Sequence, residues 1–470
     1  MANKTIGERE IVLAVLLEIT ENGEYSHLIL NQVLDKYRYL DKKERAFITR
    51  VTEGTLEHLI ELDYIIDRFS KTKTKKMKPV IRAILRMSVY QLKYMDTVPA
   101  HAVCDEAVKL AVRKGFSGLK GFVNGVLRTI SRNLEQVSYP PESSGIPYLS
   151  VGYSVPEWMI AMWEKRYPAE QVERILKAFQ EERPLSIRCN LAKNRPEELK
   201  AKLESERVNV VQHPYLKEAF CISGFDHLDG LESFRAGLFF VQDVSSMLAG
   251  RLAVSDFLDE GQSGQQTGKE NPLILDVCAA PGGKTLHMAD LLAGRGRVEA
   301  RDLTEYKISL IRENMERSGL SDERGGSVSV KQWDATVPDE SMLAKADVVL
   351  ADLPCSGLGI LGRKADLRYR MTEESARELA GLQREILNVV AAYVKPGGVL
   401  LYSTCTIHEE ENEKNAGWFL EEHPEYQMDA IAGQLPEALR ASVEEGGMLQ
   451  LLPGIHECDG FFIAKFKKRK

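Results

Sequence analysis

Two cysteines with polar neighbours are the residues of this chain best suited to covalent chemistry. Cys355 follows Asp352, Leu353 and Pro354 in the run DLPCSGLG, and Cys405 lies in the run STCT. A thiolate is the best neutral-pH nucleophile for adding to an electron-poor ring carbon. The prolyl loop and the hydroxyl neighbours make an apolar core an unnatural place for this pair. The other cysteines have no such setting, and we interpret them as structural: Cys104, Cys189, Cys221, Cys278 and Cys458.

Acidic residues stand at the ends of three successive predicted strands. Asp302 ends the second strand of the series, Asp334 the third and Asp352 the fourth. A carboxylate binds the vicinal hydroxyls of a ribose well, and it can also hold the Watson–Crick edge of a base. A single strand-end aspartate is often only a helix cap. Several in one register indicate a ligand crevice.

A small, glycine-rich turn follows the first strand of the series. The stretch from Leu273 to Thr285 reads LILDVCAAPGGKT, which predicts a buried strand, a tight turn and the start of a helix. Such a turn exposes backbone N–H groups and suits a nucleotide or a carboxylate-bearing cofactor. A phosphate-binding P-loop is excluded because it requires glycine where Cys278 stands, and the G-x-G-x-x-G fingerprint is absent.

Six predicted strands alternate with helical segments from residue 238 onward, which is typical of a doubly wound, Rossmann-like α/β sheet. The strands are expected at 273–279, 297–303, 328–334, 346–354, 398–406 and 460–466. Ligands of such sheets lie at the carboxyl ends of the strands, where all the candidate residues are found. Residues 255–271 and 322–327 are polar and are expected to be surface insertions.

The remainder of the chain predicts two further domains, as expected for 470 residues. Apolar residues recur at helical spacing from Ile6 to about Asn133, whereas 138–147 reads as a proline-rich linker and the following ninety residues mix short strands with helices. We therefore expect an all-α domain over 1–137, a small ferredoxin-like or RNA-recognition-like α/β domain over 148–237, and the doubly wound domain over 238–470.

Charge and cysteine usage narrow the class of partner. Residues 1–133 hold 23 Lys and Arg against 16 Asp and Glu, a net charge of +7, and the remainder carries −14. Basic runs at Lys71–Arg82 and Lys465–Lys470 favour nucleic-acid binding. No C-x-x-C pair, 18-residue apolar run or signal peptide is present, so we expect a cytoplasmic protein without a metal site, a disulfide framework or a membrane span.

The motifs DVCAAPGGKT, DLPCSGLG and YSTCT, in this order, resemble those of the RNA cytosine-5 methyltransferases that use S-adenosylmethionine. The helical N-terminal part, which closes on GFVNGVLRTISRN, resembles the antitermination-factor (NusB-like) fold, an RNA-binding module. Together they make the chain similar, over essentially its whole length, to the Sun/Fmu family of bacterial 16S ribosomal RNA (cytosine-5) methyltransferases.

The resemblance implies a role for each motif residue. Cys405 would be the nucleophile, Cys355 would assist product release, and Asp352 would lie between cofactor and target base. Asp302 would hold the ribose and Asp334 the adenine side of S-adenosylmethionine. The methionine moiety would be bordered by Cys278, Ala279, Ala280, Pro281, Gly282, Gly283 and Lys284.

The substrate implied is a cytosine in a single-stranded loop of 16S ribosomal RNA, methylated at C5 through a covalent cysteine–C6 adduct. We expect a monomer. Two alternatives stay open: a methyltransferase for transfer RNA or a protein side chain, and a non-catalytic RNA-binding or antitermination-type factor. The chain departs from the family pattern at Leu353, Gly362 and Ala365, near the RNA-contact candidates Arg363 and Lys364, and the bulky Arg301 precedes Asp302.

Overall fold

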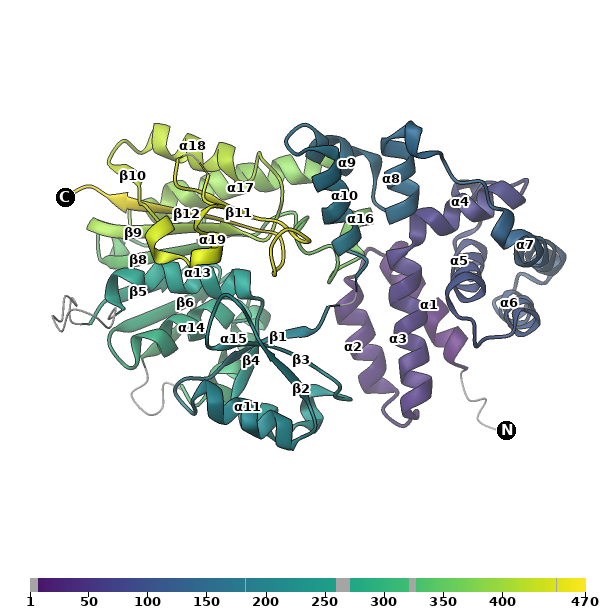
Figure 1. Ribbon diagram of the computed structural model, residues 1–470, viewed down its shortest axis with the longest axis horizontal. Coiled ribbons are helices and arrows are strands. Elements are labelled where there is room, and N and C mark those ends of the chain that lie inside the picture. The colour runs from purple at the N-terminus through teal and green to yellow at the C-terminus, as the bar shows by residue number, and fades with distance from the viewer. Residues whose placement is uncertain (1–6, 182, 259–270, 321–326, 445) are drawn as a thin grey trace. The chain divides into compact units, whose positions relative to one another are not determined.

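The structure is a computed structural model that describes residues 7–181, 183–258, 271–320, 327–444 and 446–470 (Figure 1). The chain forms two compact units. Unit one comprises Met1–Glu181 and Leu361–Thr372, and unit two comprises Glu182–Ile360 and Glu373–Lys470. None of the helices in these described ranges is long and apolar enough to cross a membrane.

Unit one is all-helical, as the apolar spacing predicted. In α1, the residues Ile11, Val12, Val15 and Leu16 recur at three and four and are all buried. Asp41 and Glu44 form a reciprocal capping box that starts α3. The helices are α1 (Glu8–Thr20), α2 (Ser26–Lys36), α3 (Lys42–Glu57), α4 (Leu59–Phe69), α5 (Pro79–Tyr94), α6 (Ala100–Arg113), α7 (Lys120–Asn133), α8 (Ile146–Tyr153), α9 (Glu157–Glu164) and α10 (Ala169–Ala178).

The segment expected to be a linker packs against unit one. Tyr139 donates a hydrogen bond of 2.9 Å to the buried Glu61, and its ring stacks on that of Tyr64. The last residues of the segment already belong to α8, because Pro147 occupies the first turn of this helix, where its missing N–H costs nothing. The proline-rich composition therefore marked a helix start as well as a turn.

Residues 361–372 interrupt the sequence of unit two, because this segment belongs to unit one and packs on its helices. Asp366 accepts hydrogen bonds from the backbone N and the hydroxyl of Ser26 at the start of α2, at 3.3 and 2.6 Å. Arg368, in α16 (Leu367–Arg370), is fully buried and donates to the carbonyls of Glu57 and Phe179. A Cβ at Gly362 would lie 3.3 Å from the backbone of Phe179, which explains the small residue there.

Unit two begins with a four-stranded antiparallel sheet in the order β2-β3-β1-β4. The strands are β1 (Leu185–Cys189), β2 (Asn209–Gln212), β3 (Ala219–Ser223) and β4 (Phe239–Val241), and α11 (Pro196–Ser205) packs Leu199 and Leu203 into its core. The domain boundary predicted after residue 237 falls just before β4, the strand that completes this sheet. The helices α9 and α10 group with unit one.

The large sheet has the order β10-β12-β9-β8-β5-β6-β7, with β11 paired to β12. The strands β7, β6, β5, β8 and β9 are parallel, whereas β12 is antiparallel to β9. The chain therefore reverses its direction of travel across the sheet between β5 and β8, the switch point at which such folds bind ligands. The bounds are β5 (Leu273–Asp276), β6 (Arg297–Asp302), β7 (Val328–Gln332), β8 (Ala346–Asp352), β9 (Val394–Thr404), β10 (Tyr426–Met428), β11 (Leu449–Leu451) and β12 (Phe461–Lys468).

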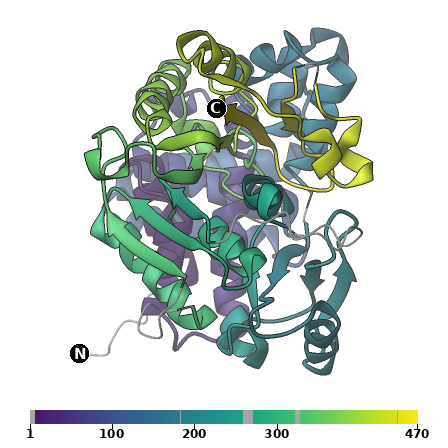
Figure 2. The same cartoon turned by 90° about the vertical axis from the view of Figure 1, so that its left-hand side faces the viewer.

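Helices cover both faces of this sheet (Figures 1 and 2), and strand alternation assigns each residue to one face. Ile274 packs with the cluster of α13 (Val244–Val254), α14 (Gly283–Leu292) and α15 (Glu305–Ser318), whereas its neighbour Leu275 packs with that of α17 (Glu373–Ala391) and α18 (Glu413–Glu422). Val348 and Val349 divide in the same way. The doubly wound fold is thus confirmed.

The structure differs from two expectations about the edges of unit two. Lys465, expected in a basic tail, is fully buried in β12 and pairs with Asp256 at 3.0 Å and Asp429 at 3.2 Å. The predicted insertion at 255–271 begins instead with a short 3-10 helix whose Phe257 is buried. The rest of that insertion, 259–270, and most of the one at 322–327 lie outside the described residues.

Candidate active site

The two candidate cysteines emerge side by side, as expected. Asp352, the last residue of β8, is paired in register with Ser403 of the parallel strand β9, so the residues that follow leave the same edge of the sheet together. The sulfur atoms of Cys355 and Cys405 are 3.3 Å apart. The contact with Cys405 and burial raise the pKa of Cys355 well above that of a free thiol. Cys355 is therefore held as a neutral thiol beside Cys405.

An ion pair joins the glycine-rich turn to the end of β8. Nζ of Lys284 lies 2.7 Å from Oδ2 of Asp352 and 3.1 Å from the hydroxyl of Ser246. Ser403 donates to the other oxygen of Asp352 at 2.8 Å, so both carboxylate oxygens are oriented. Burial lowers the pKa of Lys284, but Asp352 and, more weakly, Cys405 outweigh it and raise the pKa overall. A partly buried cation therefore lies against Asp352 and close enough to Cys405 for their charges to interact.

The turn itself is fixed by Asp302. Its Oδ2 accepts the backbone N–H of Ala280 at 2.9 Å, and its Oδ1 pairs with Lys307 at the same distance. Gly282 has a φ of 101°, which favours glycine, and α14 begins at the next residue. The predicted cofactor residues from Cys278 to Lys284 thus form one turn and the start of α14, where backbone N–H groups lack partners within the helix.

Asp276 is a site residue that sequence reasoning passed over. Its Oδ2 accepts the hydroxyl of Thr285 at 2.6 Å, whereas its Oδ1 is buried without a hydrogen-bond partner. Burial raises the pKa of this carboxyl to about 7, and the negative charge of Asp352 adds to the effect. The available signal was a single acid inside an otherwise apolar strand.

Asp334 lies in the loop after β7, exposed to solvent, and accepts hydrogen bonds from the backbone N and hydroxyl of Thr336 at 2.9 and 2.7 Å. These bonds lower its pKa. Among the described contacts, none joins Asp334 to the turn at 278–284. Its assignment to the adenine side stays a prediction.

The structure explains two of the residues near the site that depart from the family pattern. Leu353 is buried in the core cluster that contains α17. Arg301 is buried as well, and it pairs with Glu299 at 2.5 Å and Asp339 at 2.9 Å. Its charge is thus compensated within unit two.

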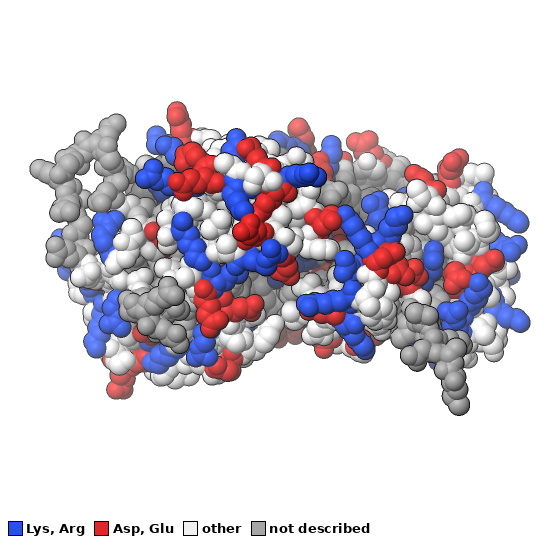
Figure 3. All heavy atoms as spheres, turned by 90° about the horizontal axis from the view of Figure 1, so that it is seen from below, with Lys and Arg blue, Asp and Glu red and all other residues white. Residues whose placement is uncertain are grey.

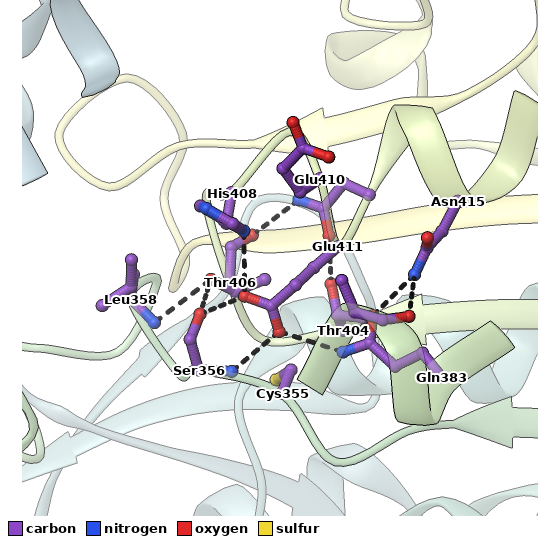
Figure 4. A network of polar contacts seen from close by, with 12 residues as sticks. Cys355, Ser356, Leu358, Gln383, Thr404, Thr406, His408, Glu410, Glu411 and Asn415 are labelled. Carbon is purple, nitrogen blue, oxygen red and sulfur yellow. Dashed lines mark hydrogen bonds and ion pairs between the residues drawn. The ribbon is translucent and has the colours of Figure 1, made fainter. Parts of the chain in front are cut away.

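A second residue missed from the sequence lies behind the cysteines. Glu411, between β9 and α18, is fully buried and accepts hydrogen bonds from the backbone N of Ser356 and the side chain of Gln383, both at 2.9 Å (Figure 4). The neighbouring Glu410 points away from this network and pairs with Lys414 at 2.6 Å. No group of three or more His, Cys, Asp or Glu that could hold a metal ion occurs in the part of the chain that the structure describes.

Three family models match successive parts of the chain. Residues 7–132 match the NusB family, residues 155–226 match the ferredoxin-like domain of the RsmF/B-like methyltransferases, and residues 266–467 match the 16S rRNA methyltransferase RsmB/F. The predicted fold classes of the three parts are thereby confirmed.

Individual proteins resemble the chain over its whole length. The Bacillus subtilis (strain 168) protein named probable ribosomal RNA small subunit methyltransferase B is 34% identical, over 99% of this chain and 100% of that protein. The crystal structure of PH0851 matches with a TM-score of 0.80 at 26% identity and covers 100% of both chains. A methyltransferase homolog from Pyrococcus horikoshii matches with a TM-score of 0.55 at 26% identity, over 68% of this chain and 97% of that one. The chain therefore belongs to the family of small-subunit ribosomal RNA methyltransferases to which the RsmB/F model corresponds.

Proposed function

We propose that the protein methylates C5 of one cytosine in 16S ribosomal RNA, with S-adenosylmethionine as methyl donor and a covalent cysteine–C6 adduct as intermediate. The observation that carries the proposal is the 3.3 Å contact between Cys355 and Cys405 beside the partly buried Lys284–Asp352 pair. Two thiols and one ion pair at the carboxyl ends of parallel strands suit nucleophilic addition to a pyrimidine ring.

Cys405 is the nucleophile. Its thiolate adds to C6 of cytosine, which makes C5 nucleophilic enough to accept a methyl group. Cys355, kept as a thiol by its raised pKa, donates a hydrogen bond that stabilises the Cys405 thiolate. After methylation the C5 proton leaves to a water that Cys355 orients, the C5–C6 double bond re-forms and Cys405 departs.

Asp352 accepts a hydrogen bond from the N4 amino group of the base, and from N3 once that nitrogen takes up a proton from solvent as Cys405 adds, which suits a carboxylate whose position Ser403 fixes. Lys284 neutralises part of its charge and attracts the developing thiolate of Cys405. The pair thus orients the base and stabilises the charge that builds up during addition.

The turn at 278–284 fits S-adenosylmethionine, which supplies an electrophilic methyl group on a sulfonium. The unpartnered, buried Oδ1 of Asp276 suits the ammonium of the methionine moiety, and the first N–H groups of α14 suit its carboxylate. Asp302 would share its carboxylate between the turn and the ribose, and Asp334 would lie on the adenine side. Cys278, Ala279, Ala280, Pro281, Gly282, Gly283 and Lys284 would border the methionine moiety.

We assign RNA recognition to residues 1–137 and 148–237 and catalysis to 238–470. The exposed lysines between Lys71 and Lys78 supply positive charge for phosphate contacts. On the face shown in Figure 3, basic and acidic side chains are interleaved, so charge alone does not single out one RNA surface there. A single-stranded loop is the substrate expected, because the base must be unstacked to be reached at C5 and C6. We further propose a cytoplasmic monomer.

The test is methyl transfer from tritiated S-adenosylmethionine to 16S ribosomal RNA, transfer RNA and protein, combined with variants of the two cysteines. Cys405→Ala is expected to abolish transfer. Cys355→Ala is expected to accumulate a covalent protein–RNA adduct that migrates slowly in a denaturing gel. An adduct with Cys405→Ala instead would reverse the two roles.

The alternatives predict other outcomes. Transfer to transfer RNA or protein alone would redirect the substrate, and bisulfite sequencing of RNA from cells without the protein would locate the modified cytosine. Undetectable binding of S-adenosylmethionine in calorimetry would favour a non-catalytic RNA-binding factor.

A further inference from the structure

We propose that Glu411 is a positioning residue that holds the loop of Cys355 against the loop of Cys405. This inference deepens the proposed function and rests on it for its catalytic readout. The side chain is fully buried, lies six residues after Cys405 in the same β9–α18 connection and is hydrogen-bonded directly to the residue after Cys355 (Figure 4).

One carboxylate oxygen of Glu411 fixes the backbone of the Cys355 loop. Its Oε2 accepts the N–H of Ser356 and an N–H of the Gln383 side chain, both at 2.9 Å. The same Gln383 amide nitrogen donates to the carbonyl of Pro354 at 2.8 Å. The residues on both sides of Cys355 are therefore tied to Glu411, directly or through one side chain.

The other oxygen reaches the Cys405 loop through two hydroxyls. Ser356 donates its hydroxyl hydrogen to Oε1 of Glu411, so the 2.7 Å contact between Ser356 and Thr406 must use the hydrogen of Thr406. Thr406 in turn accepts the N–H of Leu358 at 3.3 Å. The hydrogen bonds thus run in one direction, from Leu358 through Thr406 and Ser356 to the carboxylate.

The sheet alone does not provide this link. The register of β8 and β9 ends at Asp352 and Ser403, so neither cysteine lies within the paired strands. Beyond that point the described backbone bonds from the Cys355 loop run from Leu353 to the carbonyl of Ser403 at 3.0 Å and from Gly359 to the carbonyl of Cys405 at 3.1 Å. The Glu411 network supplies the side-chain connection between the residues that directly follow each cysteine.

Charge and geometry can be separated by substitution. Glu411→Ala leaves the N–H groups of Ser356 and Gln383 without their acceptor. Glu411→Gln keeps one oxygen for these two donors, and its NH₂ group can donate to the hydroxyl of Ser356, which then donates to Thr406 instead. The Gln variant therefore keeps the same contacts between heavy atoms without the negative charge, and only the hydroxyl hydrogen of Thr406 loses its acceptor.

The negative charge of Glu411 affects the pKa of Cys355, which can be measured separately. Glu411 is one of the groups that raise the pKa of Cys355, after Cys405 and burial. The other ionisable groups against Glu411 are His408, whose Nδ1 lies 3.3 Å from the carboxylate, and Tyr402, whose hydroxyl donates to the backbone carbonyl. Glu411→Gln is therefore expected to lower the pH at which Cys355 becomes reactive toward iodoacetamide.

The positioning test measures the sulfur pair without methyl transfer. Diamide takes one hydrogen from each thiol across its N=N bond while the S–S bond forms, and mass spectrometry of peptides identifies the Cys355–Cys405 disulfide. In the full chain we expect Glu411→Ala to slow this reaction at least tenfold. Glu411→Gln should stay within about threefold of the wild type, and the matched control Glu410→Gln should be unchanged.

We expect kcat for methyl transfer to rank the variants in the same order as the disulfide rate. Because misplacement of a reacting group by about 1 Å can cost on the order of 100-fold in rate, kcat of Glu411→Ala should fall by roughly that factor. KM for S-adenosylmethionine should be unchanged, since the hydrogen bonds described for this network do not reach residues 278–284. Glu411→Gln should recover most of the loss.

Two results would overturn the inference. One is a folded Glu411→Ala variant with the disulfide rate and kcat of Glu410→Gln. If Glu411→Ala does not fold, Ser356→Ala removes only the hydroxyl link, and a wild-type disulfide rate in that variant would be equally decisive. A wild-type chain that forms the disulfide but methylates no RNA would refute the proposed function and leave the positioning result standing.

Discussion

A buried ion pair ties the small sheet to the helix that carries the glycine-rich turn. Arg188 of β1 lies 2.5 Å from Asp290 of α14, and both side chains are 0% exposed. Asp290 also accepts the backbone N–H groups of Leu191 and Ala192, at 3.3 and 3.2 Å. The position of α14, and so of the turn at its N-terminus, depends on this pair.

Replacing Arg188 by methionine removes the cation and leaves the Asp290 carboxylate buried with only two long N–H bonds. Breaking a buried pair in this way costs about 3–5 kcal/mol. At about 1.4 kcal/mol per factor of ten, the amides of α14 that exchange through this opening should exchange about 100- to 5,000-fold faster. The double variant Arg188→Met with Asp290→Leu should recover most of the loss, because the uncompensated charge is gone.

Hydrogen–deuterium exchange followed by mass spectrometry measures this effect peptide by peptide. The matched control is Arg251→Met on α13, whose guanidinium is 3.6 Å from Glu218 and whose side chain is 39% exposed, so it should cost less than about 1 kcal/mol. Peptides of α5 in unit one report on nonspecific change. The prediction is wrong if Arg188→Met speeds exchange in α14 no more than Arg251→Met does. It is also wrong if the losses of stability from the two substitutions simply add in the double variant.

Three further predictions concern charges that are buried or partly buried. The pKa of Asp276 is raised to about 7, so unit two loses stability as pH rises from about 4 through 7 and the carboxyl ionises. The free energy of unfolding in urea should fall by on the order of 4 kcal/mol at most over this range, and Asp276→Asn should remove the fall. Glu61 has the opposite pH dependence. Burial raises its pKa, but hydrogen bonds from His58, Lys93 and Tyr94 outweigh burial and lower the pKa to about 2. The wild type should therefore lose about 3 kcal/mol between pH 5 and 2, and Glu61→Gln should not. Lys284→Met leaves Asp352 without its cation and should weaken S-adenosylmethionine binding at least tenfold in calorimetry.

The strand ends of the large sheet could be predicted from the sequence because they depend on local pattern. An apolar run that stops at Asp352 and another that stops at Ser403 define two parallel strands, and parallel strands present their carboxyl ends at one edge. This rule predicts that Cys355 and Cys405 leave the sheet at the same edge, but it does not predict the 3.3 Å contact between their sulfur atoms. The glycine-rich turn is local in the same sense, since Gly282 adopts the conformation that its residue type favours.

Features that depend on distant residues could not be predicted in this way. Lys465 reads as part of a basic tail until Asp256 and Asp429, far away in the sequence, are seen to surround it. Glu411 stands in a run of acidic residues and has no local sign that distinguishes it from Glu410. Residues 361–372 follow the DLPCSGLG motif yet pack on unit one, because their partners, Ser26 and Glu57 among them, come from the beginning of the chain.

The order of the strands also sets the order of the candidate site residues. Reading across the sheet, Cys405 follows β9, Cys355 follows β8, which ends at Asp352, and β5 leads into the turn with Lys284. Neighbouring strands are about 4.8 Å apart, so the proposed nucleophile and the turn lie about two spacings, or roughly 10 Å, from each other at the sheet edge. Under the proposed function, that gap would accommodate a flat pyrimidine ring between a thiolate on one side and a methyl donor on the other. Asp352 ends the strand between them, where its carboxylate would hold the edge of the ring, so the topology of the sheet would separate and align the two reagents.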